Sequence, residues 1–157
     1  MIYLDTSFVM SLYSSDVNTR MAIAQFPKMP VVRLLSPLVE IEVVNAFELR
    51  VFRREISRGE AELGMRNFDH DLEAGILASR SLPDDLFARA TVLSMKHTAQ
   101  LGVRTMDVLH VAAAIEYGAT SLFSFDLRQR EVAHAAGLKL NPMPKRPRPA
   151  AQPGTAP

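Results

Sequence analysis

Short apolar runs alternate with segments of helical periodicity along the first 141 residues of this chain. We interpret four apolar runs as buried strands: residues 1–4, 31–35, 122–125 and, more weakly, 138–140. Apolar residues recur with a helical spacing in five segments: residues 36–56, 61–72, 86–101, 105–117 and 128–136. Strands separated by helices predict an α/β domain with a mostly parallel sheet.

Residues that favour helix ends support several of these boundaries. Ser36 followed by Pro37 is a favourable helix start, and Thr105 can cap the helix that follows it. Gly102 and Gly118 stand where two of the periodic segments stop, as expected for residues that end helices.

Residues 142–157 differ in composition from the rest of the 157-residue chain. They hold six of the ten prolines, three basic residues and no acid, whereas residues 1–141 hold 15 basic and 17 acidic residues. We therefore predict one domain over residues 1–141 and a disordered tail over residues 142–157. A domain with a net charge of −2 is not a generally basic nucleic-acid binder, so it would bind a polyanion through local patches or a metal ion.

The sequence also excludes several classes of protein. It contains no cysteine, which excludes a disulfide scaffold, a thiolate zinc site and a cysteine nucleophile. No apolar run reaches the ~18 residues that a transmembrane helix needs, and residues 1–13 lack the basic start and the cleavage site of a signal peptide. We expect a cytoplasmic protein with no contact to a membrane.

Four acids stand in unusually apolar surroundings. Asp5 and Asp126 each follow a predicted strand, and Asp107 lies in the first turn of a predicted helix. Glu42 lies about two turns into another helix, with Asn45 three residues on and therefore on the same face. Because ligands of parallel α/β sheets bind beyond the carboxyl ends of the strands, we expect these side chains to lie near one site.

A divalent cation would explain why so many acids are embedded among apolar residues. An isolated buried carboxylate is costly, whereas several carboxylates around a hard cation are not. Oxygen ligands without cysteine favour Mg²⁺ or Mn²⁺ over Zn²⁺. Carboxylates that converge without a cation repel one another, so we expect at least one of them to have a raised pKa.

Four segments resemble, in the same order, the acidic motifs of PIN-domain proteins. They are residues 2–7 (IYLDTS), 42–47 (EVVNAF), 104–114 (RTMDVLHVAAA) and 122–126 (LFSFD), and the resemblance spans residues 1 to about 141. Within that family the sequence is most similar to the VapC-type toxins of toxin–antitoxin pairs.

The resemblance implies a three-layer α/β/α fold and a Mg²⁺- or Mn²⁺-dependent endoribonuclease acting on structured RNA. It implies catalytic and metal-binding roles for Asp5, Glu42, Asp107 and Asp126. Supporting polar roles follow for Thr6, Ser7 and Ser124, besides Asn45. It also implies a cognate VapB-type antitoxin as partner, and a homodimer.

Two alternatives remain open from the sequence. A haloacid-dehalogenase-like phosphatase also carries an aspartate after its first strand, but its chemistry needs a second aspartate two positions later, where this chain has Ser7. A PIN-like interaction module that has lost catalysis is the other alternative, although all four acids are present.

Basic residues gather after Glu42. Arg50, Arg53, Arg54 and Arg58 have the spacing of one helical stripe. We consider it equally as a solvated helix end and as a contact for RNA or for an acidic partner. His110 follows Asp107 by three residues, and we interpret it as a packed or hydrogen-bonded structural residue.

Overall fold

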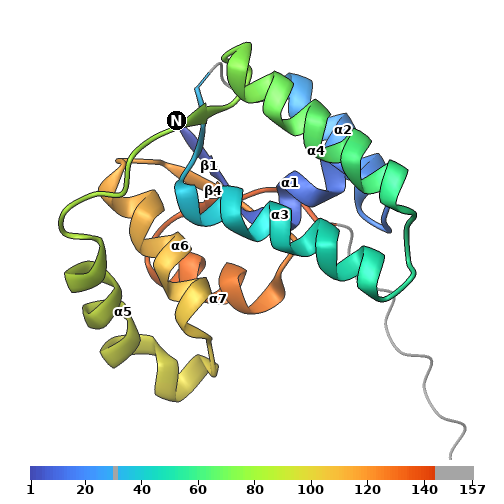
Figure 1. Cartoon of the computed structure of the whole chain (residues 1–157). Coiled ribbons are helices and arrows are strands. Elements are labelled where there is room, and N and C mark those ends of the chain that lie inside the picture. Colours follow the sequence, from blue (N-terminus) through green and yellow to red (C-terminus); the bar gives the residue numbers. More distant parts are fainter. Residues whose placement is uncertain (30–31, 144–157) are drawn as a thin grey trace, which may run out of the picture.

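The computed structural model describes residues 1–29 and 32–143, and the account below concerns those residues (Figure 1). Nearly all of the tail that the sequence predicts to be disordered lies outside this part of the chain.

Five parallel strands form one sheet in the order β3-β2-β1-β4-β5. The strands are β1 (Ile2–Leu4), β2 (Arg33–Leu35), β3 (Ala78–Ser79), β4 (Ser121–Phe123) and β5 (Lys139–Leu140). The chain builds the sheet outward from β1 to β3 on one side, and then returns to the other side of β1 for β4 and β5. The strand order therefore reverses between β1 and β4, which is the place where α/β sheets bind ligands.

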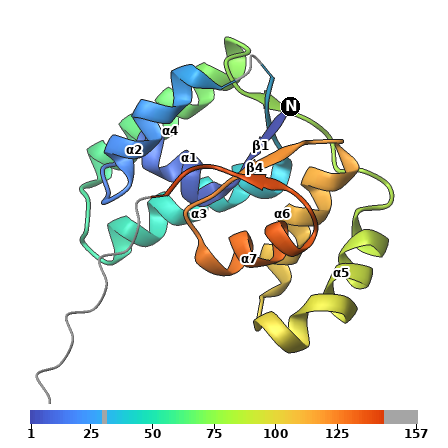
Figure 2. The ribbon, with the colours of Figure 1, turned by 180° about the vertical axis from the view of Figure 1, so that it is seen from behind.

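Two groups of helices cover the sheet. The first group is α1 (Thr6–Tyr13), α2 (Thr19–Gln25), α3 (Pro37–Phe52) and α4 (Arg58–Glu73). The second is α5 (Leu86–Leu101), α6 (Thr105–Glu116) and α7 (Leu127–Ala135). Figures 1 and 2 show the first group on one side of β1 and β4 and the second group on the other. The predicted three-layer α/β/α class with a parallel sheet is confirmed.

Central strands and α6 supply much of the core, because both are apolar on all sides. Tyr3, Leu4 and Leu122 are fully buried in the sheet. The residues of α6 from Val108 to Ala114 are all buried, since this helix packs against α5, α7 and β4. A helix that is buried on all sides has no amphipathic stripe, and the sequence of α6 is accordingly apolar almost all round.

The helix predicted over residues 36–56 ends at Phe52, four residues early. Arg54 adopts a left-handed backbone conformation with φ of 59°, which stops the helix. The predicted stripe of Arg50, Arg53, Arg54 and Arg58 is therefore wrong as a single helical face, because α3 has ended before Arg53 and Arg58 belongs to α4.

Four elements have no counterpart in the sequence prediction: α1, α2, the short 3-10 helix η1 (Phe26–Lys28) and β3. The first two helices have only eight and seven residues, and β3 has two, so none offers enough turns or alternation for a clear pattern. The strand predicted over 122–125 is β4, which ends at Phe123 and leaves Asp126 to begin α7.

Candidate active site

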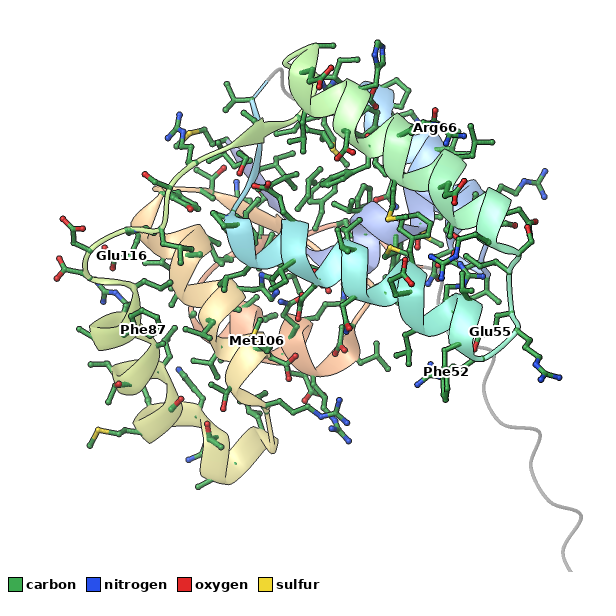
Figure 3. All side chains as sticks on the ribbon, in the orientation of Figure 1. Phe52, Glu55, Arg66, Phe87, Met106 and Glu116 are labelled. Carbon is green, nitrogen blue, oxygen red and sulfur yellow. The ribbon has the colours of Figure 1, made fainter. Side chains whose placement is uncertain are left out.

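A cleft of about 350 Å³ opens beyond the carboxyl ends of β1 and β4. All four predicted acids line it, together with three of the predicted supporting residues: Asp5, Glu42, Asp107, Asp126, Thr6, Ser7 and Asn45. Met106 of α6, labelled in Figure 3, also lines the cleft. The structure therefore brings together Asp5, which follows β1, and side chains from α1, α3, α6 and the start of α7.

Asp5 is the most deeply placed acid, with 3% of its surface exposed. It is the N-cap of α1 and accepts hydrogen bonds from the Phe8 backbone nitrogen at 2.9 Å and from the Ser7 hydroxyl at 2.8 Å. The Ser124 hydroxyl donates to its other oxygen at 2.9 Å. Burial raises the pKa of Asp5 to about 6, and these hydrogen bonds offset burial only in part. The predicted raised pKa is present, but burial causes it rather than repulsion between acids.

Glu42 is held from two sides. The Thr6 hydroxyl donates to its Oε2, and the Nε2 atom of His110 lies 2.8 Å from the same oxygen. Burial acts to raise the pKa of Glu42, but the hydrogen bond and the charge interaction with His110, together with the hydrogen bond from Thr6, outweigh it, and the pKa is lowered. Glu42 is therefore ionised and oriented before any ligand arrives.

Asp126 and Asp107 both occupy the first turns of helices. Asp126 is the N-cap of α7, and its Oδ1 accepts from the backbone nitrogens of Arg128 at 2.8 Å and Gln129 at 3.2 Å. Asp107 accepts from the backbone nitrogen of Arg104 at 2.9 Å. The predicted capping role of Thr105 is wrong, because Thr105 is the first residue of α6 itself and Arg104 occupies the cap position.

Two serines join the ends of β1 and β4 beneath the cleft. The Ser7 hydroxyl accepts from the Phe125 backbone nitrogen at 2.7 Å, and the Ser124 hydroxyl accepts from the Asp126 backbone nitrogen at 3.0 Å. Since both hydroxyls also donate to Asp5, they fix this carboxylate relative to Asp126. Ser124 does not line the cleft itself and acts through these bonds.

Several residues of the site were not found from the sequence. Gln129 lines the cleft although it is 2% exposed, and its Oε1 lacks a hydrogen-bond partner among the described residues. Arg130 and Asn141 support the end of β4, because the Asn141 Oδ1 accepts from the Ser124 backbone nitrogen at 2.9 Å and from Arg130 at 2.6 Å. Arg130 and Asn141 are far from Ser124 or from each other in the sequence, so no local pattern indicates their role. Gln129 could have been recognised, because it follows Asp126 by three residues.

His110 is buried and hydrogen-bonded, as expected, but it also lines the cleft through its contact with Glu42. Its spacing from Asp107 on one helix face was the available signal. The predicted Ser36 cap also acts differently, since its hydroxyl contacts Tyr3 at 2.7 Å and makes no capping bond.

None of the four arginines singled out after Glu42 lines the cleft. Arg50 donates to the Ser14 hydroxyl and to the Ser15 carbonyl oxygen, and its guanidinium lies 3.3 Å from Glu55. Arg53 and Arg54 lie exposed in the turn after α3. The structure thus separates these arginines from the acidic site.

Metal binding at the cleft depends on the donor groups that line it. Among residues 1–29 and 32–143, no three His, Asp or Glu side chains are close enough together to form a ready metal-binding group. Mg²⁺, however, is usually held by one or two carboxylates together with water and substrate phosphates. The carboxylate, hydroxyl and amide oxygens that line the cleft are of the kind that Mg²⁺ and Mn²⁺ prefer, so the donor set fits such a cation.

The sequence matches the family model described as PIN domain over residues 2–135. A search of curated proteins found no significant match. In the part of the chain that the structure describes, no helix is long and apolar enough to cross a membrane.

Solved structures with the same fold include three bacterial proteins. Mycobacterium tuberculosis VapC20, a sarcin-ricin loop cleaving toxin, has 19% identity and a TM-score of 0.64 over 88% of this chain and 96% of its own. FitAcB from Neisseria gonorrhoeae has 16% identity and a TM-score of 0.60 over 89% and 96% of the two chains. VapBC2 from Rickettsia felis, bound to a promoter DNA fragment, has 16% identity and a TM-score of 0.62 over 90% and 98%.

Proposed function

Because the chain belongs to the PIN domain family, we propose that it is a Mg²⁺- or Mn²⁺-dependent endoribonuclease toxin of the VapC type. The observation that carries the proposal is the meeting of Asp5, Glu42, Asp107 and Asp126 in one cleft beyond the carboxyl ends of parallel strands. Membership of this family removes the phosphatase alternative. The hydrogen bonds that hold the acids favour a working site over an interaction module without catalysis.

One or two of the four acids would hold the cation directly through their carboxylate oxygens, with water and phosphate oxygens as its further ligands. A bound divalent ion would offset the negative charge of a phosphodiester and lower the pKa of water for attack on phosphorus. Without that positive charge, a cleft lined by carboxylates repels a phosphate, so the acids and the ion form one functional unit.

The chain itself contributes position and charge. Ser7 and Ser124 hold Asp5 in a fixed orientation at the base of the cleft, and Thr6 and His110 do the same for Glu42. The carboxylates of Asp107 and Asp126 lie at helix N-termini, where the helix dipole stabilises negative charge. Asn45 adds an uncharged amide on the α3 side of the cleft.

We propose structured RNA as the substrate, with arginines at the rim of the cleft as backbone contacts. Arg104 and Arg128 are exposed, and the carboxylates of Asp107 and Asp126 bind their backbone nitrogens. Both arginines therefore begin at the edge of the acidic site. The similarity to a toxin that cleaves the sarcin-ricin loop supports a folded RNA substrate.

A VapB-type antitoxin and a second copy of the chain are the proposed partners. The similarity in fold to a solved toxin-antitoxin complex from Klebsiella pneumoniae supports an antitoxin partner. Phe52 and Phe87, labelled in Figure 3, are 82% and 66% exposed and provide apolar area for contacts with proteins. Arg53 and Arg54, which lie away from the cleft, suit an acidic segment of a partner better than the substrate.

The direct test is cleavage of tRNA and ribosomal RNA by the purified chain with Mn²⁺ and with a chelator. We expect defined fragments with Mn²⁺ and none with chelator. Replacing Arg104 and Arg128 with glutamine should reduce the salt dependence of RNA affinity by about one unit of slope per lost contact, whereas replacing Arg53 and Arg54 should leave it unchanged. RNA that stays intact under every condition would contradict the proposal.

A further inference from the structure

A hydrogen-bonded network of buried polar side chains runs from the sheet to the cleft. The Tyr3 hydroxyl, on the central strand β1, lies 2.7 Å from the Ser36 hydroxyl and 2.9 Å from the Nδ1 atom of His110. On the other side of the imidazole, Nε2 lies 2.8 Å from the Glu42 Oε2. Tyr3 and Ser36 are fully buried, and His110 is 3% exposed.

The donors and acceptors of this network admit one consistent placement of the hydrogen atoms when the imidazole is neutral. Ionised Glu42 can only accept hydrogen bonds, so Nε2 of His110 carries the hydrogen that it donates to Oε2. The Nδ1 atom is then an acceptor, and the Tyr3 hydroxyl donates to it. The Tyr3 oxygen in turn accepts from the Ser36 hydroxyl.

Packing fixes the same groups in place. The Tyr3 ring stacks on the Tyr117 ring at a centroid distance of 6.1 Å, and it lies 6.0 Å from the His110 ring. Tyr3 is anchored between the neighbouring strands by its pairing with Leu34 and Leu122. The Tyr3 hydroxyl is therefore held by the sheet beside the Nδ1 atom of His110.

We propose that Tyr3 and His110 are positioning residues that set the orientation of Glu42, with His110 in the tautomer protonated at Nε2. The proposal rests on the function proposed above. A histidine with a purely structural role would need partners only within the core. The Nε2 atom of His110 instead bonds to the carboxylate of Glu42, which lines the cleft. Partners that orient a ligand in this way commonly affect metal affinity or activity by about 10- to 100-fold.

The test compares Tyr3→Phe with Tyr13→Phe. Both changes remove one hydroxyl from a part-buried or buried ring, but the Tyr13 hydroxyl donates to Asp71 at 2.6 Å, away from the cleft. We expect Tyr3→Phe to weaken Mn²⁺ binding by about tenfold or more in calorimetry, and Tyr13→Phe to leave it unchanged. Ser36→Ala, which keeps every ring in place, should weaken binding by less than Tyr3→Phe and serves if that variant does not fold.

A second measurement needs no metal. Nitrogen NMR of histidine-labelled, metal-free protein reports which ring nitrogen is protonated, and comparison with His110→Gln assigns the signals of His110. We expect the Nε2–H tautomer in the wild type and a changed Nδ1 signal in Tyr3→Phe, because that nitrogen loses its hydrogen bond.

The two readouts separate the inference from the function on which it rests. A wild-type ring that carries a hydrogen on Nδ1 and none on Nε2 would overturn the inference. So would an Nδ1 signal that is unchanged in Tyr3→Phe, together with equal Mn²⁺ affinities in the two Tyr→Phe variants. If the wild type neither binds Mn²⁺ nor cleaves RNA, the proposed function fails, while the NMR result still decides whether Tyr3 orients His110.

Discussion

The hydroxyl of Ser124 donates a hydrogen bond to the carboxylate of Asp5 over 2.9 Å, across 119 positions of the sequence. This bond joins the segment after β4 to the segment after β1, at the point where the strand order reverses. The bond positions Asp5 and favours its ionised form, whereas burial makes this carboxylate costly to ionise.

The first prediction concerns the stability of the metal-free protein. The pKa of Asp5 is about 6 in the folded state against 3.8 for the ordinary group, so the folded protein holds this proton more tightly. The stabilisation that results is complete below pH 4 and is lost as the pH rises through 6. Asp5→Asn has no such group. The free energy of unfolding of this variant, relative to that of the wild type, should therefore rise by on the order of 3 kcal/mol between pH 4 and pH 7.

Urea unfolding in chelator at a series of pH values measures this difference. Comparison of the two proteins at each pH cancels the contribution of all other titrating groups. Curves for wild type and Asp5→Asn that run parallel over this range would show that burial does not raise the pKa of Asp5.

The second prediction concerns cation binding. A cation that binds only the folded state should stabilise the wild type by about 2.7 kcal/mol at a hundredfold excess over its dissociation constant. Asp5→Asn loses one charged oxygen ligand, so its gain with Mn²⁺ should be smaller. Thermal melts with Mn²⁺ and with chelator give both values, and an equal gain in the two proteins would remove Asp5 from the proposed metal site.

The third prediction concerns the packing of α3 against α4. A Cβ atom at Gly64 would lie 2.5 Å and 2.6 Å from atoms of the Phe47 ring and 2.8 Å from the Tyr13 carbonyl oxygen. Because a ring and a backbone carbonyl would both have to move, Gly64→Ala should destabilise the protein by about 1–3 kcal/mol in urea unfolding.

Gly59 provides the matched control in the same helix. A Cβ atom there would have no neighbour within 4 Å, so Gly59→Ala should be neutral or stabilise the protein by up to about 1 kcal/mol. Equal effects of the two substitutions would mean that Gly64 is not needed for close packing of the helices.

The fourth prediction concerns the C-terminal boundary. Residues 144–157 offer few apolar groups to bury and contain five prolines, so a chain ending at Met143 should keep the melting temperature of the full chain. A chain ending at Asn141 should lose a little stability, because Gln25 donates to the Pro142 carbonyl oxygen at 2.9 Å and Met143 packs against the core. A loss of several degrees in the longer truncation product would show that the tail contributes to the fold.

The sequence predicted the fold class and the four cleft acids because both leave local signals. An aspartate that follows a buried strand, as Asp5 does, stands out in any reading of the chain. Ser124 and Asn141 come together only through the sheet. No local pattern could reveal that Ser124 bonds to the Asp5 carboxylate, or that Asn141 bonds to the Ser124 backbone.

The arginine stripe shows the opposite case, in which a local pattern misleads. The spacing of Arg50 and Arg54 is helical in the sequence, but α3 ends at Phe52 and Arg54 adopts a left-handed conformation without being a glycine. The structure around that turn, including the ion pair of Arg50 with Glu55, decides where the helix ends. Intrinsic preference and spacing could not predict it.

The most direct measurement of the central claim is Mn²⁺-dependent RNA cleavage by Asp107→Asn beside Asp69→Asn. Both replace a carboxylate by an amide of the same size, but Asp107 lines the cleft and Asp69 is exposed on α4. We predict that Asp107→Asn folds and loses cleavage by about a hundredfold or more, since a metal ion contributes several kcal/mol to such a reaction, while Asp69→Asn cleaves at the wild-type rate. Cleavage by Asp107→Asn at the wild-type rate would contradict the claim that these acids form one catalytic site.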